Sequence, residues 1–209
     1  MPSFFQEIIR GGNKLVYILT GTALTAIISL IGILQNKRKP QPKSKRIEMV
    51  LALFSTLLFI PYMVIAVMAY THGADMESLQ KFGVLRTIQA IQNSPVTDRS
   101  DDLDQPGNIL IYYRFGCGDC EAIYDCLKAE VDGKENIYWV ASRQSEGQKL
   151  LQKYTVSEVP AGVIIQNDGM YISHVLCSPV YDDADEKGGI QQLDIYALNR
   201  LLDLQKRVR

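Results

Sequence analysis

Two long apolar segments stand near the start of the chain, before any alternating pattern begins. Leu15 to Leu34 contains 20 residues without a charge, and Met49 to Tyr70 contains 22. Each has the length of a helix that crosses a bilayer. The ~135 residues that follow are too few to bury two such helices in a core. We therefore expect transmembrane helices at 15–34 and 49–70, after a short external N-terminus at 1–14.

A basic segment separates these two apolar segments. Residues 37–46 carry six positive charges and no negative one, whereas residues 75–209 carry 14 Lys and Arg against 21 Asp and Glu, a net charge of −7. Short basic loops remain in the cytoplasm. The loop at 35–48 is therefore expected inside the cell and the C-terminal domain outside it, in a multi-pass protein of the cell membrane. The opposite topology would carry six positive charges across the bilayer.

A basic run also suits nucleic acid. Between two membrane helices it is better explained as a topology signal and a contact for anionic lipid. Membrane lipid is therefore an expected partner, and nucleic acid is not.

An amphipathic pattern opens the external part of the chain. Apolar residues recur at near-helical spacing from Met76 to Gln92, which predicts one helix. The stretch 93–108, with its prolines and aspartates, is predicted to be a loop. Together these features define an amphipathic helix and linker at 71–107.

Strand and helix patterns then alternate through the rest of the chain. The expected strands are 109–115, 137–141, 162–166 and 171–177, the last two forming a hairpin around Asn167-Asp168-Gly169. The expected helices are 119–131, 146–154 with Ser145 as N-cap, and 194–208, and 178–189 is expected to be a loop. This order predicts an α/β domain at 108–209, with a mixed sheet flanked by helices.

Two cysteines follow the first of these strands. Cys117 and Cys120 stand in Phe115-Gly116-Cys117-Gly118-Asp119-Cys120, at the start of a helix. The helix dipole and backbone N–H groups stabilise a thiolate at the first position, and the second thiol lies one turn away. This spacing suits thiol–disulfide exchange. The alternative is half of a zinc site, with the remaining ligands drawn from Cys126, His174 and Cys177.

The remaining cysteines leave several alternatives open. Cys126 suits a buried small apolar residue on its helix, a structural disulfide with Cys177, or a third redox-active thiol. Four cysteines in a domain outside the membrane fit an oxidising compartment. The acidic run at 182–186 offers the oxygen ligands that calcium uses, or is a solvated loop.

The chain resembles the thioredoxin family in two motifs and in the order of segments between them. One motif is the Cys-x-x-Cys segment at 115–120. The other is Lys153-Tyr154-Thr155-Val156-Ser157-Glu158-Val159-Pro160, followed by an apolar strand and the Asn-Asp-Gly turn. The resemblance covers roughly residues 105–208. It implies a thioredoxin-like fold and a cis bond between Val159 and Pro160, whose backbone lies against the cysteines and pairs with the strand of a substrate.

The resemblance also implies roles for the site residues. Cys117 would be the exposed nucleophile and Cys120 the thiol that resolves the mixed disulfide. Beyond the redox-active Cys117–Cys120 disulfide no cofactor or metal is expected. Gly118 and Asp119 would tune the redox chemistry. At ~7 Å and an effective dielectric of ~40, the charge of Asp119 costs the thiolate about 1 kcal/mol, so we expect Cys117 to be less acidic than in a strong oxidase.

Three positions depart from the family pattern. Gly116 replaces the usual tryptophan, Asp119 replaces the usual proline, and Ile111 stands where cytoplasmic thioredoxins carry a buried acid. These departures argue against a general cytoplasmic-type reductase. A valine before the cis proline also occurs in extracytoplasmic thiol oxidases.

Together these features predict a membrane-tethered thiol–disulfide oxidoreductase that acts on extracytoplasmic protein thiols. Its expected partners are client proteins with cysteine thiols and an electron-transfer protein. One alternative is a membrane-anchored accessory or scaffold protein of an export, conjugation or bacteriocin system, in which the fold serves binding. Another is a heme- or metal-handling protein of cytochrome maturation. The compact two-helix anchor favours a bacterial origin.

Overall fold

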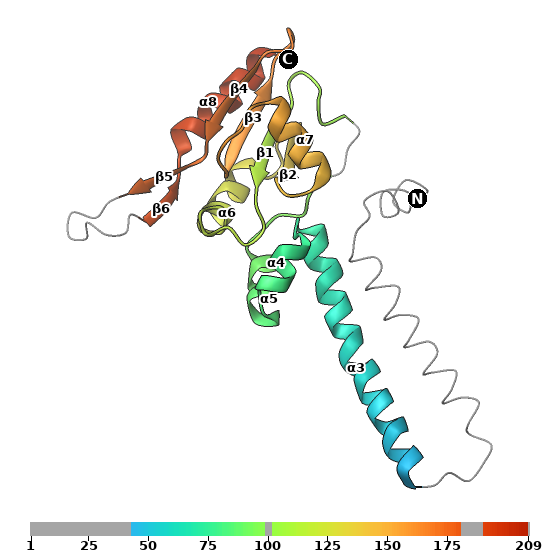
Figure 1. Cartoon of the computed structure of the whole chain (residues 1–209). Helices are drawn as coiled ribbons and strands as arrows, with labels where there is room; N and C mark the ends of the chain where they lie inside the picture. The colour runs from blue at the N-terminus through green and yellow to red at the C-terminus, as the bar shows by residue number, and fades with distance from the viewer. Residues whose placement is uncertain (1–42, 99–101, 181–189, 209) are drawn as a thin grey trace. The chain divides into compact units, whose positions relative to one another are not determined.

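The computed structural model describes residues 43–98, 102–180 and 190–208 (Figure 1). The chain divides into two compact units, residues 1–65 and 66–209, and each is described by itself. The predicted external N-terminus, the predicted helix at 15–34, the start of the basic loop and the acidic run at 182–186 lie outside the described residues.

The first unit is described through one long helix, α3 (Lys43–Thr71), whose last turns, from Ala66, belong to the second unit. Within the described residues, Leu53–Thr71 is the one segment long and apolar enough to cross a membrane. The apolar segment 49–70 is therefore helical, as predicted. Because α3 begins at Lys43, the second half of the predicted loop at 35–48 is helical as well. The two-helix anchor is not shown.

The residues after α3 form two short helices where the spacing predicted one. Helix α4 (Met76–Lys81) ends at Phe82, which has an extended backbone, and helix α5 (Val84–Gln92) begins after Gly83. The single helix predicted for 76–92 is therefore wrong. The break lets the ring of Phe82 pack on the ring of Phe115, with 6.3 Å between their centroids.

A four-stranded mixed sheet lies in the second unit, in the order β2-β1-β3-β4 (Figure 1). Its strands are β1 (Ile109–Tyr113), β2 (Ile137–Ala141), β3 (Ala161–Ile165) and β4 (Tyr171–Val175). Strand β1 runs parallel to β2 and antiparallel to β3, and β3 and β4 form the predicted hairpin. The four expected strands are thus confirmed, with small shifts at their ends.

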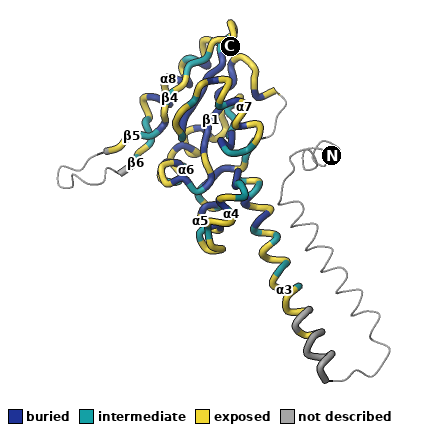
Figure 2. The backbone as a smooth tube through the Cα atoms, viewed as in Figure 1, coloured by how far each residue is buried: buried dark blue, intermediate teal, exposed yellow. Residues whose placement is uncertain are grey.

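Three helices flank this sheet: α6 (Gly118–Val131), α7 (Ser145–Lys153) and α8 (Ile195–Val208). Strands β1 and β3 are buried along their whole length (Figure 2). Alternate residues of β1 point to opposite faces, as period-two geometry requires. Ile109 and Ile111 pack with α6 and α8, whereas Leu110 and Tyr112 pack with α7. The predicted α/β class is confirmed.

One predicted helix cap differs from the structure. Gln144, and not Ser145, is the N-cap of α7, and its side chain makes no capping hydrogen bond. At α8, by contrast, the carboxylate of Asp194 accepts a hydrogen bond from the Ala197 N–H at 2.9 Å. This capping bond explains why α8 starts directly after Asp194.

A second, two-stranded sheet was not predicted. Strands β5 (Cys177–Val180) and β6 (Ile190–Leu193) pair antiparallel and contact α6. The loop predicted at 178–189 therefore begins as a strand. Leu176 joins β4 to β5: its N–H donates to the Pro160 carbonyl at 2.9 Å, and its carbonyl accepts from the Asp194 N–H at 3.0 Å.

The segment before β1 is held along the β2 edge of the sheet. The Asp98 N–H donates to the Trp139 carbonyl at 2.9 Å, and the Trp139 N–H donates to the Asp98 carboxylate at 2.7 Å. The hydroxyl groups of Thr97 and Tyr113 lie 2.7 Å apart, and the Tyr113 hydroxyl also donates to the Pro95 carbonyl. The stretch expected to be a linker is thus part of the folded unit.

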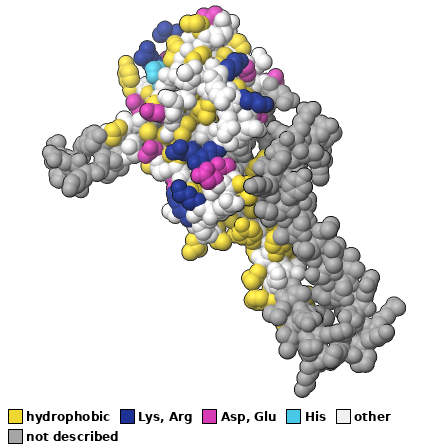
Figure 3. All heavy atoms as spheres, in the orientation of Figure 1, with side chains coloured by type: hydrophobic (Ala, Val, Ile, Leu, Met, Phe, Trp, Pro, Cys, Tyr) yellow, Lys and Arg dark blue, Asp and Glu magenta, His cyan; other side chains and the backbone are white. Residues whose placement is uncertain are grey.

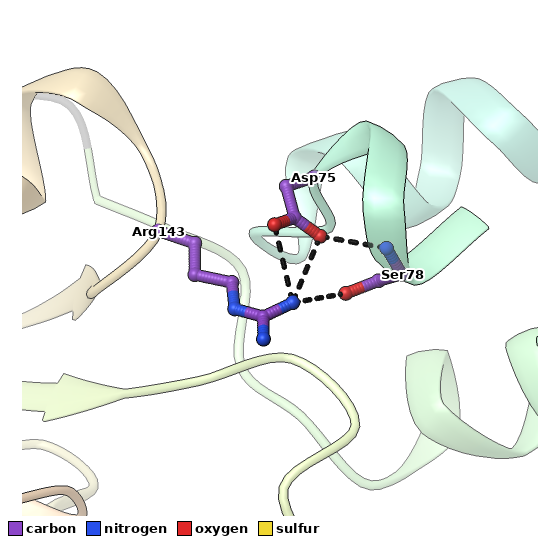
Figure 4. A network of polar contacts seen from close by, with 3 residues as sticks. All are labelled: Asp75, Ser78 and Arg143. Atoms are coloured by element: carbon purple, nitrogen blue, oxygen red, sulfur yellow. Dashed lines mark hydrogen bonds and ion pairs between the residues drawn. The ribbon is translucent and has the colours of Figure 1, made fainter. Parts of the chain in front are cut away.

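Arg143, in the loop after β2, forms hydrogen bonds and an ion pair with the start of α4 (Figure 4). Its Nη1 lies 3.1 Å from both carboxylate oxygens of Asp75 and 2.9 Å from the Ser78 hydroxyl. Asp75 is also the N-cap of α4 and accepts a hydrogen bond from the Ser78 N–H at 2.8 Å. These contacts hold α4 on the sheet domain.

Candidate active site

The loop between β1 and α6 places two cysteines at a helix start. Cys117 is the N-cap of α6, and Cys120 lies in the first turn. Both are buried, with 7% and 8% of their surface exposed, in a cluster with Tyr113 and Ala141. The expectation that Cys117 is exposed is therefore wrong. Because so little of it is exposed, a reacting partner must fit closely over this loop.

The surroundings of the two thiols make Cys117 the more acidic one. A hydrogen bond from the Cys120 thiol lowers the pKa of Cys117 most, while burial opposes this effect. The guanidinium of Arg114, whose Nη2 lies 3.7 Å from the Cys117 sulfur, lowers it further, so that the pKa of Cys117 falls to about 5. The hydrogen bond to Cys117, then burial and the charge of Cys117, raise the pKa of Cys120.

Arg114 is a site residue that the sequence analysis missed. The expectation of a less acidic Cys117 considered the charge of Asp119 and took no account of Arg114, whose opposite charge lies directly beside the sulfur. Asp119 itself is exposed in the first turn of α6. A basic residue three positions before the first cysteine was the available signal.

The second motif reaches the cysteines through its proline. The Val159–Pro160 peptide bond is cis, as the resemblance implied. Val159 packs against the cluster that contains both cysteines, and Pro160 is buried. The fold thus brings together Cys117, Cys120 and the Val159–Pro160 pair from segments that are far apart in the sequence.

The two residues between the cysteines face solvent. Gly118 begins α6, and no atom lies within 4 Å of the position a Cβ would take there. Asp119 is likewise exposed. Their role in redox tuning stays a prediction.

Residues of the helical segment 76–92 lie beside the same loop. Gly116 has a φ of +70°, and its neighbour Phe115 packs against Phe82. Arg86 of α5 forms an ion pair with Glu121 of α6, with Nη1 and Oε2 2.9 Å apart. The sequence analysis did not connect this segment with the cysteines, because only the tertiary fold brings them together.

The other cysteines are thiols on elements around α6. Cys126 is exposed, so the expectation of a buried residue is wrong. It lies one position before the buried Leu127, so its side chain points away from the buried face of α6. Cys177 is half-buried at the start of β5, where burial and then the negative charges of Asp119 and Cys117 raise its pKa.

No metal centre is formed by the described residues. His174 lies on β4, and Cys126 and Cys177 lie on α6 and β5. In the part of the chain that the structure describes, no three His, Cys, Asp or Glu side chains are grouped so as to hold a metal ion.

Fold and site thus define an α/β domain with a dithiol at a helix N-terminus and a cis proline beside it. No family model matches the chain, and no curated protein matches it. Among solved structures, the C-terminal domain of DsbD from Neisseria meningitidis, in its oxidised form, is similar at 15% identity. The match covers 65% of this chain and 97% of that one, with a TM-score of 0.29. So low a TM-score supports no conclusion, and the proposals below rest on this chain's own geometry.

Proposed function

We propose that the protein is a membrane-tethered thiol–disulfide oxidoreductase of thioredoxin-like fold, which exchanges electrons between its Cys117–Cys120 pair and the thiols of extracytoplasmic client proteins. The observation that carries this proposal is the environment of Cys117. Cys117 is the N-cap residue of α6, and its thiol accepts a hydrogen bond from Cys120 and lies beside Arg114. These features favour a thiolate, which is the attacking species in disulfide exchange.

The chemistry follows from the difference between the two thiols. In the reducing direction the Cys117 thiolate attacks one sulfur of a client disulfide, a new S–S bond forms, and the departing client sulfur takes a proton. Cys117 then no longer carries the charge that raises the pKa of Cys120. Cys120 therefore loses its proton more readily and attacks the Cys117 sulfur. The client leaves with two thiols, and the Cys117–Cys120 disulfide remains.

The reverse sequence oxidises a client dithiol, and the low pKa of Cys117 favours that direction. A stabilised thiolate stabilises the reduced protein, which makes its disulfide a stronger oxidant. We expect a reduction potential closer to about −120 mV, typical of a strong oxidant, than to about −270 mV, typical of a reductant. An electron-transfer partner would restore the starting form, and the Val159–Pro160 backbone would pair with the client strand.

A redox titration of the full chain in lipid nanodiscs tests this proposal. The protein would be equilibrated in glutathione buffers, and its free thiols would be trapped and counted by mass spectrometry. We expect one reversible two-electron transition at Cys117 and Cys120. It should disappear in Cys117→Ser and persist in Cys126→Ser, a matched control on the same helix. If no transition occurs, the oxidoreductase proposal fails and an accessory or scaffold role explains the fold better.

The proposed tether consists of the segments 15–34 and 49–70, with the domain outside the cell. Its support is the apolar helix Leu53–Thr71 and the positive charge of residues 37–46. The exposed thiol of Cys126 allows a direct test. A membrane-impermeant maleimide should label Cys126 in intact cells, whereas a cysteine introduced by Ser44→Cys should react only after lysis. The opposite pattern would place the domain in the cytoplasm.

A further inference from the structure

Helix α5 has apolar side chains on the side that points away from the domain on which it packs. It buries Thr87 and Ala90, whereas Val84, Leu85 and Ile88 are exposed, Leu85 to 84%. These three residues share one side of the helix, because positions four apart are neighbours on its surface. Figure 3 shows hydrophobic side chains on the face where α5 lies. The described residues of this domain leave this side uncovered.

The same helix packs beside the end of the candidate membrane span. Ala90 of α5, Ala69 of α3 and Ala74 belong to one buried cluster. The last turns of α3, from Ala66 to Thr71, lie in the same compact unit as α5. If the span ends in the membrane surface at Thr71, a helix packed against its last turn lies at the depth of the lipid headgroups.

From these observations we infer that α5 is an interfacial helix, whose Val84, Leu85 and Ile88 insert into the lipid beside the span. The inference rests on the membrane tether proposed above. Lipid is the occupant that this position favours, because a helix packed against the end of a span meets lipid without any further partner. The sequence of α5 also contains no acidic residue that anionic headgroups would repel.

The inferred contact would hold the dithiol close to the bilayer. Arg86 of α5 makes a two-pronged contact with Glu121 of α6, at 2.9 and 3.0 Å. Phe82, just before α5, packs on Phe115, just before the dithiol. With α5 held in lipid, α6 would present Cys117 to clients and electron donors whose sulfur atoms lie at the membrane surface.

Tryptophan fluorescence of the full chain in nanodiscs tests this inference. The chain has a single tryptophan, Trp139. Its signal is measured in the wild-type protein and subtracted from the spectra of the variants. The indole introduced by Leu85→Trp should emit at shorter wavelength and be quenched by lipids with brominated acyl chains. Tyr196→Trp, at an equally exposed helical position (81%), is the matched control and should stay unquenched.

A third variant separates failure of this inference from failure of the tether. Leu57→Trp places an indole on the exposed surface of the span itself. If that indole is not quenched, the tether and the inference are both rejected. If it is quenched and the indole of Leu85→Trp is not, only the inference is rejected. Blue-shifted emission without bromine quenching would mean that protein, and not lipid, covers α5. If the shift appears only in discs that hold two chains, the covering protein is a second copy of this chain.

Discussion

A side chain at position 116 would have to occupy the space that the ring of Phe82 fills. A Cβ placed on Gly116 would lie 2.1 Å from Cε2 of Phe82, and the φ of +70° at Gly116 is itself unfavourable for other residues. The aromatic ring beside the dithiol loop therefore comes from Phe82, in the link between α4 and α5. The loop and the segment 76–92 are structurally coupled.

This coupling predicts a non-additive pair of substitutions. Gly116→Ala should lower the free energy of unfolding by about 2–4 kcal/mol, since the left-handed backbone and the overlap with Phe82 both oppose it. In a Phe82→Ala background the overlap is gone, and about 1–2 kcal/mol should remain. Denaturant unfolding of the four proteins in detergent completes the cycle. An equal cost in both backgrounds would mean that Phe82 does not lie against Gly116.

The acidity of Cys117 predicts its reactivity at each pH. Because its pKa is lowered to about 5, its alkylation rate with iodoacetamide should rise through about pH 5 and level off by neutral pH. In the unfolded chain the same rate should rise near pH ~8.5. Mass spectrometry of the peptides separates the four cysteines. Cys120, whose pKa is raised, should react slowly throughout. A midpoint near the unfolded value in the folded protein would contradict the site geometry.

Replacing Arg114 should weaken the thiolate. Arg114→Met removes the charge beside the Cys117 sulfur and keeps a long side chain, so the alkylation midpoint should rise by about one pH unit. The disulfide should become less oxidising for the same reason. Arg200→Met, at an exposed arginine on α8, should change neither value. Should Arg114→Met leave the midpoint unchanged, the hydrogen bonds from Cys120 and the helix N-terminus would explain the low pKa of Cys117 without Arg114.

The Arg143–Asp75 contact should make α4 sensitive to acid. Although partial burial raises the pKa of Asp75, hydrogen bonds from Ser78 and the charge of Arg143 lower it below 3.8 overall. A carboxylate with a lowered folded pKa adds stability above its unfolded pKa and loses it as the pH falls through the folded value. The protection of the α4 amides, which is their exchange rate corrected for the pH dependence of unprotected amides, should therefore decrease below pH ~4.

Arg143→Met tests this contact at neutral pH. It should speed amide exchange in α4 by roughly five- to thirtyfold, which corresponds to about 1–2 kcal/mol for a half-buried contact. Lys206→Met removes an exposed ion pair with Asp203 and is the control, with an expected effect within about 0.5 kcal/mol. Exchange in α4 that is equally fast in both variants would show that α4 is held by its apolar contacts alone.

Local patterns in the sequence were enough to predict many elements of the fold. The strand at 137–141 and the buried face of α6 follow from apolar spacing that one element determines by itself. The cis bond before Pro160 was implied by the resemblance of the motif around it to the thioredoxin family, and not by apolar spacing. These features need little information from elsewhere in the chain.

The features that the sequence did not reveal depend on contacts between distant segments. The break between α4 and α5 at Phe82 is explained by the packing of its ring on Phe115. The apolar spacing continues across this break and so did not reveal it. Strands β5 and β6 lie in a polar, glycine-containing stretch, and among the described strands they pair only with each other. The importance of Arg114 depends on where its side chain points after β1 ends, which spacing alone does not determine.

The packing along the β2 edge also determines which truncated fragments of the protein would keep their contacts. A fragment that starts at residue 108 would lose Thr97 and Pro95, the hydrogen-bond partners of Tyr113, and Asp98, which covers Trp139. The bared edge strand would then invite pairing between molecules. The folded unit starts at Ala66, inside the apolar stretch that ends at Thr71. A fragment that keeps the whole folded unit would therefore carry the apolar residues 66–71 at its new N-terminus, whereas a cut after Thr71 would remove part of that unit.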